Sequence, residues 1–145
     1  MGSAINFMPR LLITEDDSEN QKFLLFFLKR YFFVDICDSS ESFYEMMSKE
    51  KYDIIMMDIS IRGDKNGLEL TKELKSNPST SGIPVLCYTA HAFNKDRINA
   101  LEAGCDVYIS KPAEVYSLLE SLFELLKRKG KMMIGESPFN GLATS

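Results

Sequence analysis

The chain lacks the features that mark extracellular, membrane or nucleic-acid-binding proteins. Its three cysteines, Cys37, Cys87 and Cys105, are odd in number and have no C-x-x-C spacing, so neither a disulfide framework nor a zinc site is expected. We expect them to be buried thiols in a reducing cytoplasm. No apolar run reaches the roughly 18 residues of a membrane span, and no signal-peptide pattern is present. The net charge of −4 offers no basic excess for binding nucleic acid directly.

What remains is the composition of one globular domain. The chain has 145 residues, of which 45% are hydrophobic and 26% are charged, enough for a single substantial core. We expect an N-terminal extension at 1–8, a folded domain at 9–129, and a flexible tail or linker at 130–145, where Gly, Ser, Pro and Asn occur without periodicity. The tail is too short to form a second domain.

Short apolar runs alternate with longer amphipathic ones along the domain. Strands are predicted at 10–14, 34–37, 53–57, 83–88 and 107–109, and helices at 18–29, 40–49, 67–76, 94–103 and 114–129. Strand–helix alternation of this kind indicates an α/β fold, a doubly wound five-stranded parallel sheet with helices on both faces.

Several residues mark the ends of the predicted helices. Ser18 and Gln21 have the spacing of a capping box, and Asn66 offers a similar start to the third helix. Gly104 suits the left-handed position that ends the fourth helix. Asp17 follows a strand directly, so its expected role is that of a structural N-terminal cap.

The first predicted helix contains the segment 23–28, which is apolar on nearly every side. Such a helix is either deeply buried or partly covered by a partner protein. Burial is the interpretation we favour.

Chemically active residues follow four of the predicted strands. The acidic run Glu15–Asp17 follows the first strand and Asp58 the third, and Thr89 with Ala90 and Lys111 with Pro112 follow the fourth and fifth. The carboxyl ends of parallel strands form the ligand-binding edge of such a sheet. Clustered carboxylates repel one another and therefore need a cation, for which a divalent metal is the obvious candidate. A metal, a hydroxyl and an ammonium together suit phosphoryl transfer to a carboxylate.

Each residue also has an ordinary structural interpretation. An aspartate such as Asp58 often shapes a turn, a threonine such as Thr89 often satisfies a strand end, and Lys111 alone would be a surface lysine. Four complementary groups at four strand ends make the joint functional interpretation the stronger one.

These motifs resemble the receiver domain of bacterial two-component response regulators over roughly residues 10–127. The resemblance rests on the run ending at Glu15–Asp17, the apolar strand before Asp58, the segment ending at Thr89–Ala90, and Lys111–Pro112. It implies a flavodoxin-like sheet of strand order 2-1-3-4-5.

The resemblance also implies a role for each residue. Asp58 would be the phospho-acceptor, and Mg²⁺ would be bound by Asp16, by Asp58, by Glu15 largely through water, and by the backbone carbonyl of Ser60. Thr89, Ala90 and Lys111 would hold the phosphoryl group, and Tyr108 would act with Thr89 as the conformational switch. The bond before Pro112 is usually cis in the family.

The chain departs from the family pattern after Asp58. The loop that leads to Gly67 is one residue longer than usual, and Arg62 stands where proline is common. No catalytic group is lost. His91, two residues past Thr89, occupies a position that can affect the phosphoryl lifetime, although a surface histidine is the simpler interpretation.

The expected function is therefore that of a receiver and not of a conventional enzyme. We expect it to take a phosphoryl group from a histidine kinase or a histidine phosphotransfer protein and to switch a face that binds a downstream protein. The chain would be either a stand-alone receiver or a piece of a larger sensor kinase.

A rival function is that of a binding module of the same fold that is never phosphorylated, although such modules lose an acidic residue, the acceptor or the lysine. A phosphatase with an aspartate nucleophile would need a second carboxylate at Ser60, and a dinucleotide-binding protein would need a G-x-G-x-x-G motif after the first strand.

Overall fold

Five strands alternate with five helices in the computed structural model, which describes residues 8–90 and 93–130. The strands are β1 (Arg10–Thr14), β2 (Phe33–Cys37), β3 (Ile54–Met57), β4 (Val85–Thr89) and β5 (Val107–Ser110). The helices are α1 (Ser18–Leu28), α2 (Ser40–Lys49), α3 (Gly67–Ser76), α4 (Asn94–Ala103) and α5 (Val115–Arg128). The predicted domain lies almost wholly in the described part, whereas nearly all of the predicted tail and of the predicted N-terminal extension lies outside it.

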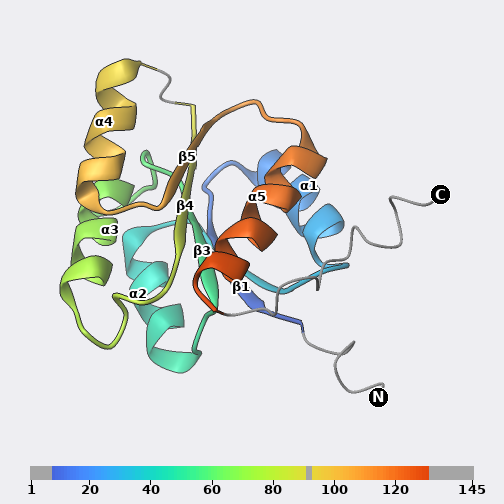
Figure 1. Ribbon diagram of the computed structural model, residues 1–145, viewed down its shortest axis with the longest axis horizontal. Helices are drawn as coiled ribbons and strands as arrows, with labels where there is room; N and C mark the ends of the chain where they lie inside the picture. The colour runs from blue at the N-terminus through green and yellow to red at the C-terminus, as the bar shows by residue number, and fades with distance from the viewer. Residues whose placement is uncertain (1–7, 91–92, 131–145) are drawn as a thin grey trace.

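The strands form one parallel sheet in the order β2-β1-β3-β4-β5, which confirms the predicted doubly wound, flavodoxin-like fold. Helices α1 and α5 cover one face of the sheet, and α2, α3 and α4 cover the other (Figure 1). The winding reverses between β1 and β3, and ligands of such sheets bind at this point, beyond the carboxyl ends of the strands.

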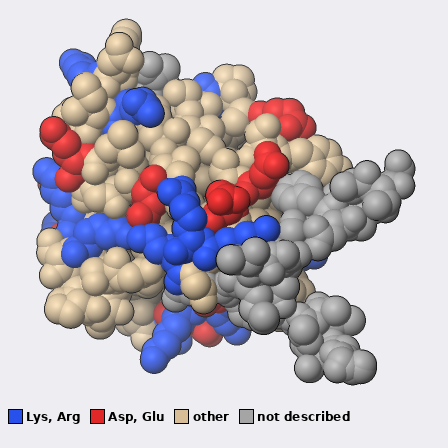
Figure 2. Space-filling model, in the orientation of Figure 1, with Lys and Arg blue, Asp and Glu red and all other residues tan. Residues whose placement is uncertain are grey.

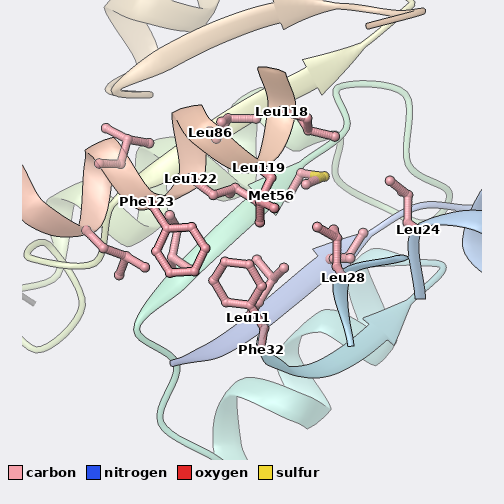
Figure 3. Packing of buried hydrophobic residues seen from close by; sticks show 14 residues of the cluster. Leu11, Leu24, Leu28, Phe32, Met56, Leu86, Leu118, Leu119, Leu122 and Phe123 are labelled. Atoms are coloured by element: carbon pink, nitrogen blue, oxygen red, sulfur yellow. The ribbon is translucent and has the colours of Figure 1, made fainter. Parts of the chain in front are cut away.

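The three central strands, β1, β3 and β4, are buried on both faces, so their apolar residues alternate between two cores. Leu11, Ile13 and Met56 point toward α1 and α5, whereas Leu12 and Met57 point toward the other three helices. Figure 3 shows the first core, where Leu118, Leu119 and Leu122 from α5 and Leu24 and Leu28 from α1 close over the sheet. Within this core the rings of Phe32 and Phe123 stack at 5.0 Å between centroids.

Helix ends largely follow the predicted signals, with one correction. Asn66 forms a capping box with Glu69, and Gly104 adopts a φ of 111° at the end of α4. The prediction that Ser18 caps the first helix is wrong, whereas the cap role expected for Asp17 is confirmed, because the Asp17 carboxylate accepts from the Asn20 N–H at 2.9 Å. An aspartate one residue earlier supplies the same acceptor, so α1 begins at Ser18.

Helix α1 exposes more apolar surface than predicted. Phe23 is 56% exposed, Leu25 40% and Phe26 62%, whereas Leu24 and Leu28 are buried. The preference for burial on every side was therefore wrong, because only one stripe of an outer helix faces the sheet. None of the helices in residues 8–90 and 93–130 combines the length and the apolar character that crossing a bilayer demands.

At the end of the sheet opposite the carboxyl ends, Asp106 connects several elements. Its carboxylate accepts a hydrogen bond from the Val85 N–H at 2.8 Å and forms ion pairs with Lys75 and Lys129, both at 3.2 Å. Burial works against the ionised form of Asp106, but these three donors outweigh it and hold the pKa of Asp106 below its usual value. The start of β5 is therefore tied to β4, α3 and α5.

Candidate functional site

The carboxyl ends of the strands bring the predicted site residues together at one edge of the sheet. Glu15 and Asp16 follow β1, Asp58 follows β3, Thr89 ends β4, and Lys111 follows β5. Three of these residues are almost completely buried, with exposed fractions of 2% for Glu15, 4% for Asp58 and 0% for Thr89. Polar groups buried this far need partners.

The two carboxylate oxygens of Asp58 have different donors. Oδ1 accepts from the Thr89 hydroxyl at 3.0 Å and from the N–H and hydroxyl of Ser60 at 3.1 and 3.2 Å. Oδ2 accepts from the Lys111 ammonium at 2.9 Å. The Asp58 N–H itself donates to the Thr14 hydroxyl at 2.8 Å, which fixes the end of β3 against β1. The carboxylate is thus held in one orientation by groups from three segments of the chain.

Lys111 links Asp58 to Glu15. Its ammonium lies 2.6 Å from Glu15 Oε1, and the other oxygen of Glu15 accepts from the Asp17 N–H at 3.1 Å. Burial acts to lower the pKa of Lys111, but the hydrogen bonds to Glu15 and Asp58 outweigh it and raise the pKa above the usual value. Lys111 therefore remains a cation throughout the neutral range.

Asp16 does not contact Lys111. Its half-buried carboxylate lies 3.7 Å from Nε of Arg62, in the loop between β3 and α3. Among the residues that the structure describes, no three acidic, histidine or cysteine side chains converge as a ready-made metal cage. Magnesium retains several waters and needs only one or two carboxylates, so Asp16 and Asp58, both close to the winding reversal, fit it as a donor set.

The lengthened loop packs against the start of α2. The Arg62 carbonyl accepts from the Ser40 N–H at 2.8 Å, and Arg62 forms an isolated parallel bridge with Ser39. The Glu41 carboxylate accepts from the Asp64 N–H at 3.3 Å, and this bond is the main reason that the pKa of Glu41 is lowered. In the sequence, Arg62 was notable only because it stands where proline is common in the family. Its contact with Asp16 depends on how the loop packs against α2, which the sequence does not show.

The remaining predicted site residues lie around the buried carboxylate. Ala90 is exposed directly after β4, and the Lys111–Pro112 peptide bond is cis. Tyr108 is half-buried in β5, and its hydroxyl is buried with no hydrogen-bond partner in the described part of the chain. Burial raises the pKa of Tyr108. His91 lies outside the described residues.

The surface charge near the fold's broad face is mixed. Figure 2 shows a narrow band of basic side chains with acidic side chains directly beside it. A protein that holds nucleic acid usually presents a broad basic face. The face shown does not have that character.

The comparison with known families identifies the chain. The model of the response regulator receiver domain matches residues 11–123. The chain belongs to the response regulator receiver family. Receivers are signalling switches in two-component systems, and phosphoryl acceptance is general to the family.

Curated relatives of this receiver are transcriptional regulatory proteins. CusR of Escherichia coli is 34% identical over 131 residues, which are 90% of this chain and 56% of CusR. The phosphate regulon protein PhoB of Escherichia coli is 28% identical over 128 residues, 88% of this chain and 56% of PhoB. The receiver chain thus spans about half the length of these relatives, and their names describe the longer proteins.

Solved receiver structures share the fold. A CheY-like receiver from Methanospirillum hungatei has a TM-score of 0.78 and 25% identity, covering 86% of this chain and 98% of that one. The receiver of a sensor histidine kinase from Pseudomonas aeruginosa has a TM-score of 0.74 and 25% identity over 83% and 98% of the chains. The latter structure holds a magnesium ion in its active-site cleft.

Proposed function

We propose that this receiver accepts a phosphoryl group on Asp58 from a phosphohistidine of a histidine kinase or a histidine phosphotransfer protein in the cytoplasm. The observation that carries the proposal is the placement of Asp58. Its carboxylate is buried, one oxygen accepts from Thr89 and the other from Lys111. Such preorganised donors stabilise the charge that spreads over the phosphoryl oxygens during transfer.

The transfer step forms one bond and breaks one bond. A carboxylate oxygen of Asp58 attacks phosphorus, the P–N bond of the phosphohistidine breaks, and its electron pair stays on the imidazole nitrogen. Lys111 and the Thr89 hydroxyl then donate to phosphoryl oxygens instead of to the bare carboxylate, and the backbone N–H of Ala90 adds a third donor. The product is an acyl phosphate that the same site can slowly hydrolyse.

Mg²⁺, when bound, neutralises negative charge on the phosphoryl oxygens. The residues that would hold it are Asp16 and Asp58 directly, Glu15 through water, and the backbone carbonyl of Ser60. The Ser60 side chain donates to Asp58 and has no carboxyl group. It cannot serve as the second acid of an aspartate-based phosphatase, which favours a phosphorylated switch over such an enzyme.

Phosphorylation would be transmitted through Thr89 and Tyr108. When Thr89 turns its hydroxyl from Asp58 to a phosphoryl oxygen, it changes the space next to β5. The buried Tyr108 hydroxyl has no partner in the described part of the chain, so a second ring position that gives it one would be favoured. The two positions would bias the surface of α4, β5 and α5, where a downstream protein binds. No direct contact with nucleic acid or membrane is part of this proposal.

Phosphorylation by a small donor tests the function. The protein is incubated with acetyl phosphate and Mg²⁺, and its intact mass is measured. We expect a gain equal to one HPO₃ unit in the wild type and none in Asp58→Asn. Asp64→Asn is the matched control, because Asp64 is an exposed carboxylate in the same loop and should leave the adduct intact. An unmodified wild type, or an undiminished adduct in Asp58→Asn, would disprove the proposal.

A further inference from the structure

Arg62 places a permanent positive charge beside Asp16. Its Nε lies 3.7 Å from Asp16 Oδ2, and the Arg62 side chain is 68% exposed whereas the Asp16 side chain is 28% exposed. We propose that Arg62 competes with a divalent cation for the Asp16 carboxylate and thereby sets the magnesium affinity of the site. The proposal rests on the proposed function, since it takes Asp16 as a metal ligand.

The position of Arg62 is fixed by main-chain contacts of its own loop. The Ser40 N–H donates to the Arg62 carbonyl at 2.8 Å, and the Lys65 N–H donates to the Ser40 hydroxyl at 3.4 Å. Gly63 has a φ of 107°, and a Cβ added there would lie 2.3 Å from the Ser40 hydroxyl oxygen. The loop therefore lies too close to α2 for a side chain at 63, and this close packing directs the Arg62 side chain over the end of β1.

The charges of the other acidic groups explain why Asp16 is the contested one. Glu15 and Asp58 share the Lys111 ammonium, whereas Asp16 has Arg62 as its ion-pair partner. A divalent ion on Asp16 has to displace this guanidinium or accept its repulsion at a few ångströms. In a solvent-screened setting we expect that repulsion to weaken binding by about three- to tenfold.

Magnesium titrations of four variants test the proposal. Binding of MgCl₂ is followed by calorimetry, together with the rise in melting temperature that the ion causes. We expect Arg62→Gln to bind Mg²⁺ about three- to tenfold more tightly than the wild type. The difference in Mg²⁺ affinity between Arg62→Gln and the wild type should decrease as added salt screens the exposed guanidinium. Arg62→Lys should stay near the wild type, and Asp16→Asn should lose the response.

Lys65→Gln is the matched control. It removes one positive charge from the same loop, but Lys65 forms its ion pair with Glu73 on α3, away from Asp16. Its magnesium affinity should match that of the wild type. The melting temperature without Mg²⁺ should be nearly unchanged in Arg62→Gln, because the loop anchors use backbone atoms, and this separates a charge effect from a folding defect.

Unchanged or weaker binding in Arg62→Gln would overturn the proposal, as would an equal gain in Lys65→Gln. If neither the wild type nor Arg62→Gln binds Mg²⁺, the proposal also fails. The acetyl phosphate assay is scored separately. An Asp58 adduct with no effect of Arg62 refutes only the competition, whereas the absence of any adduct refutes the phospho-acceptor function itself.

Discussion

The ammonium of Lys111 lies closer to Glu15, at 2.6 Å, than to Asp58, at 2.9 Å. Glu15 is buried and its second oxygen is held by a backbone N–H, so it is a rigid partner. Lys111 is thus positioned by Glu15 and directed at Asp58. The ammonium can follow a phosphoryl group on Asp58 without losing its anchor.

Replacing Lys111 with methionine should destabilise the fold. Lys111→Met leaves the buried carboxylates of Glu15 and Asp58 next to each other without a cation, at a cost of about 3 kcal/mol in the free energy of unfolding. Adding Glu15→Gln should recover part of that loss. Urea denaturation at neutral pH measures both. Lys72→Met, on the exposed side of α3, is the control and should change little; equal losses in the two methionine variants would refute the ion-pair account.

Alanine at position 67 should disturb the carboxyl end of β3, which leads to Asp58. An added Cβ would lie 2.2 Å from the carbonyl oxygen of Asp58, so the start of α3 and the end of β3 must move apart. We expect Gly67→Ala to cost about 1–3 kcal/mol of stability and to slow phosphorylation. Gly82→Ala has nothing within 4 Å of its Cβ and should be neutral or slightly stabilising. Thermal unfolding and the acetyl phosphate assay distinguish the two.

Removing the side-chain hydroxyl should destabilise the protein at Tyr52 but not at Tyr108. The Tyr52 hydroxyl donates to Asp35 at 2.6 Å, and Tyr52→Phe should cost about 1.5 kcal/mol. The Tyr108 hydroxyl has no partner in the described residues, so Tyr108→Phe should leave stability unchanged or raise it by up to about 1 kcal/mol. Denaturant midpoints of the two variants measure this. A clear loss in Tyr108→Phe would show that the hydroxyl is already bonded.

Lowering the pH should remove the contribution that Asp106 makes to the stability of the folded protein. Its pKa is lowered in the folded protein, so the unfolded chain takes up a proton first, and the stabilisation is present above the unfolded value near 3.9 and is lost as the pH falls through the folded value. Asp106→Asn should therefore be less stable than the wild type by about 1–3 kcal/mol at neutral pH. The difference should shrink as the pH falls from about 4 toward the lower pKa of the folded state. Urea unfolding across that range measures it; a gap that stays constant would contradict the linkage.

The fold was predictable because its signals are local. Alternation of apolar runs gave the order and number of elements, and the turn and cap residues Asn66 and Gly104 marked helix ends that the structure confirms. One error concerned the apolar run of α1, whose composition does not show which side faces the sheet. The other arose where two neighbouring residues offered the same local signal. Asp17 and Ser18 are both good caps, and only the packed structure decides between them.

The sequence predicted which residues gather at the strand ends, but not which of their side chains form ion pairs. Parallel strands bring their carboxyl ends together, so Asp58, Thr89 and Lys111 were expected to meet, and they do. The pairing of Lys111 with Glu15 and of Arg62 with Asp16 depends on side-chain directions and on the course of a loop. No periodicity in the sequence encodes those.

The contacts of Asp106 have a mechanical consequence. Asp106 ties the start of β5 to β4 and to helices on both faces of the sheet. These contacts lie at the end of the sheet opposite the carboxyl ends of the strands, where Asp58 lies. Strand β5 is thus fixed at its start by Asp106, and its carboxyl end is paired directly with Thr89 through Ser110. A displacement of Thr89 would therefore be passed to the carboxyl end of β5, while the Asp106 end would stay in place.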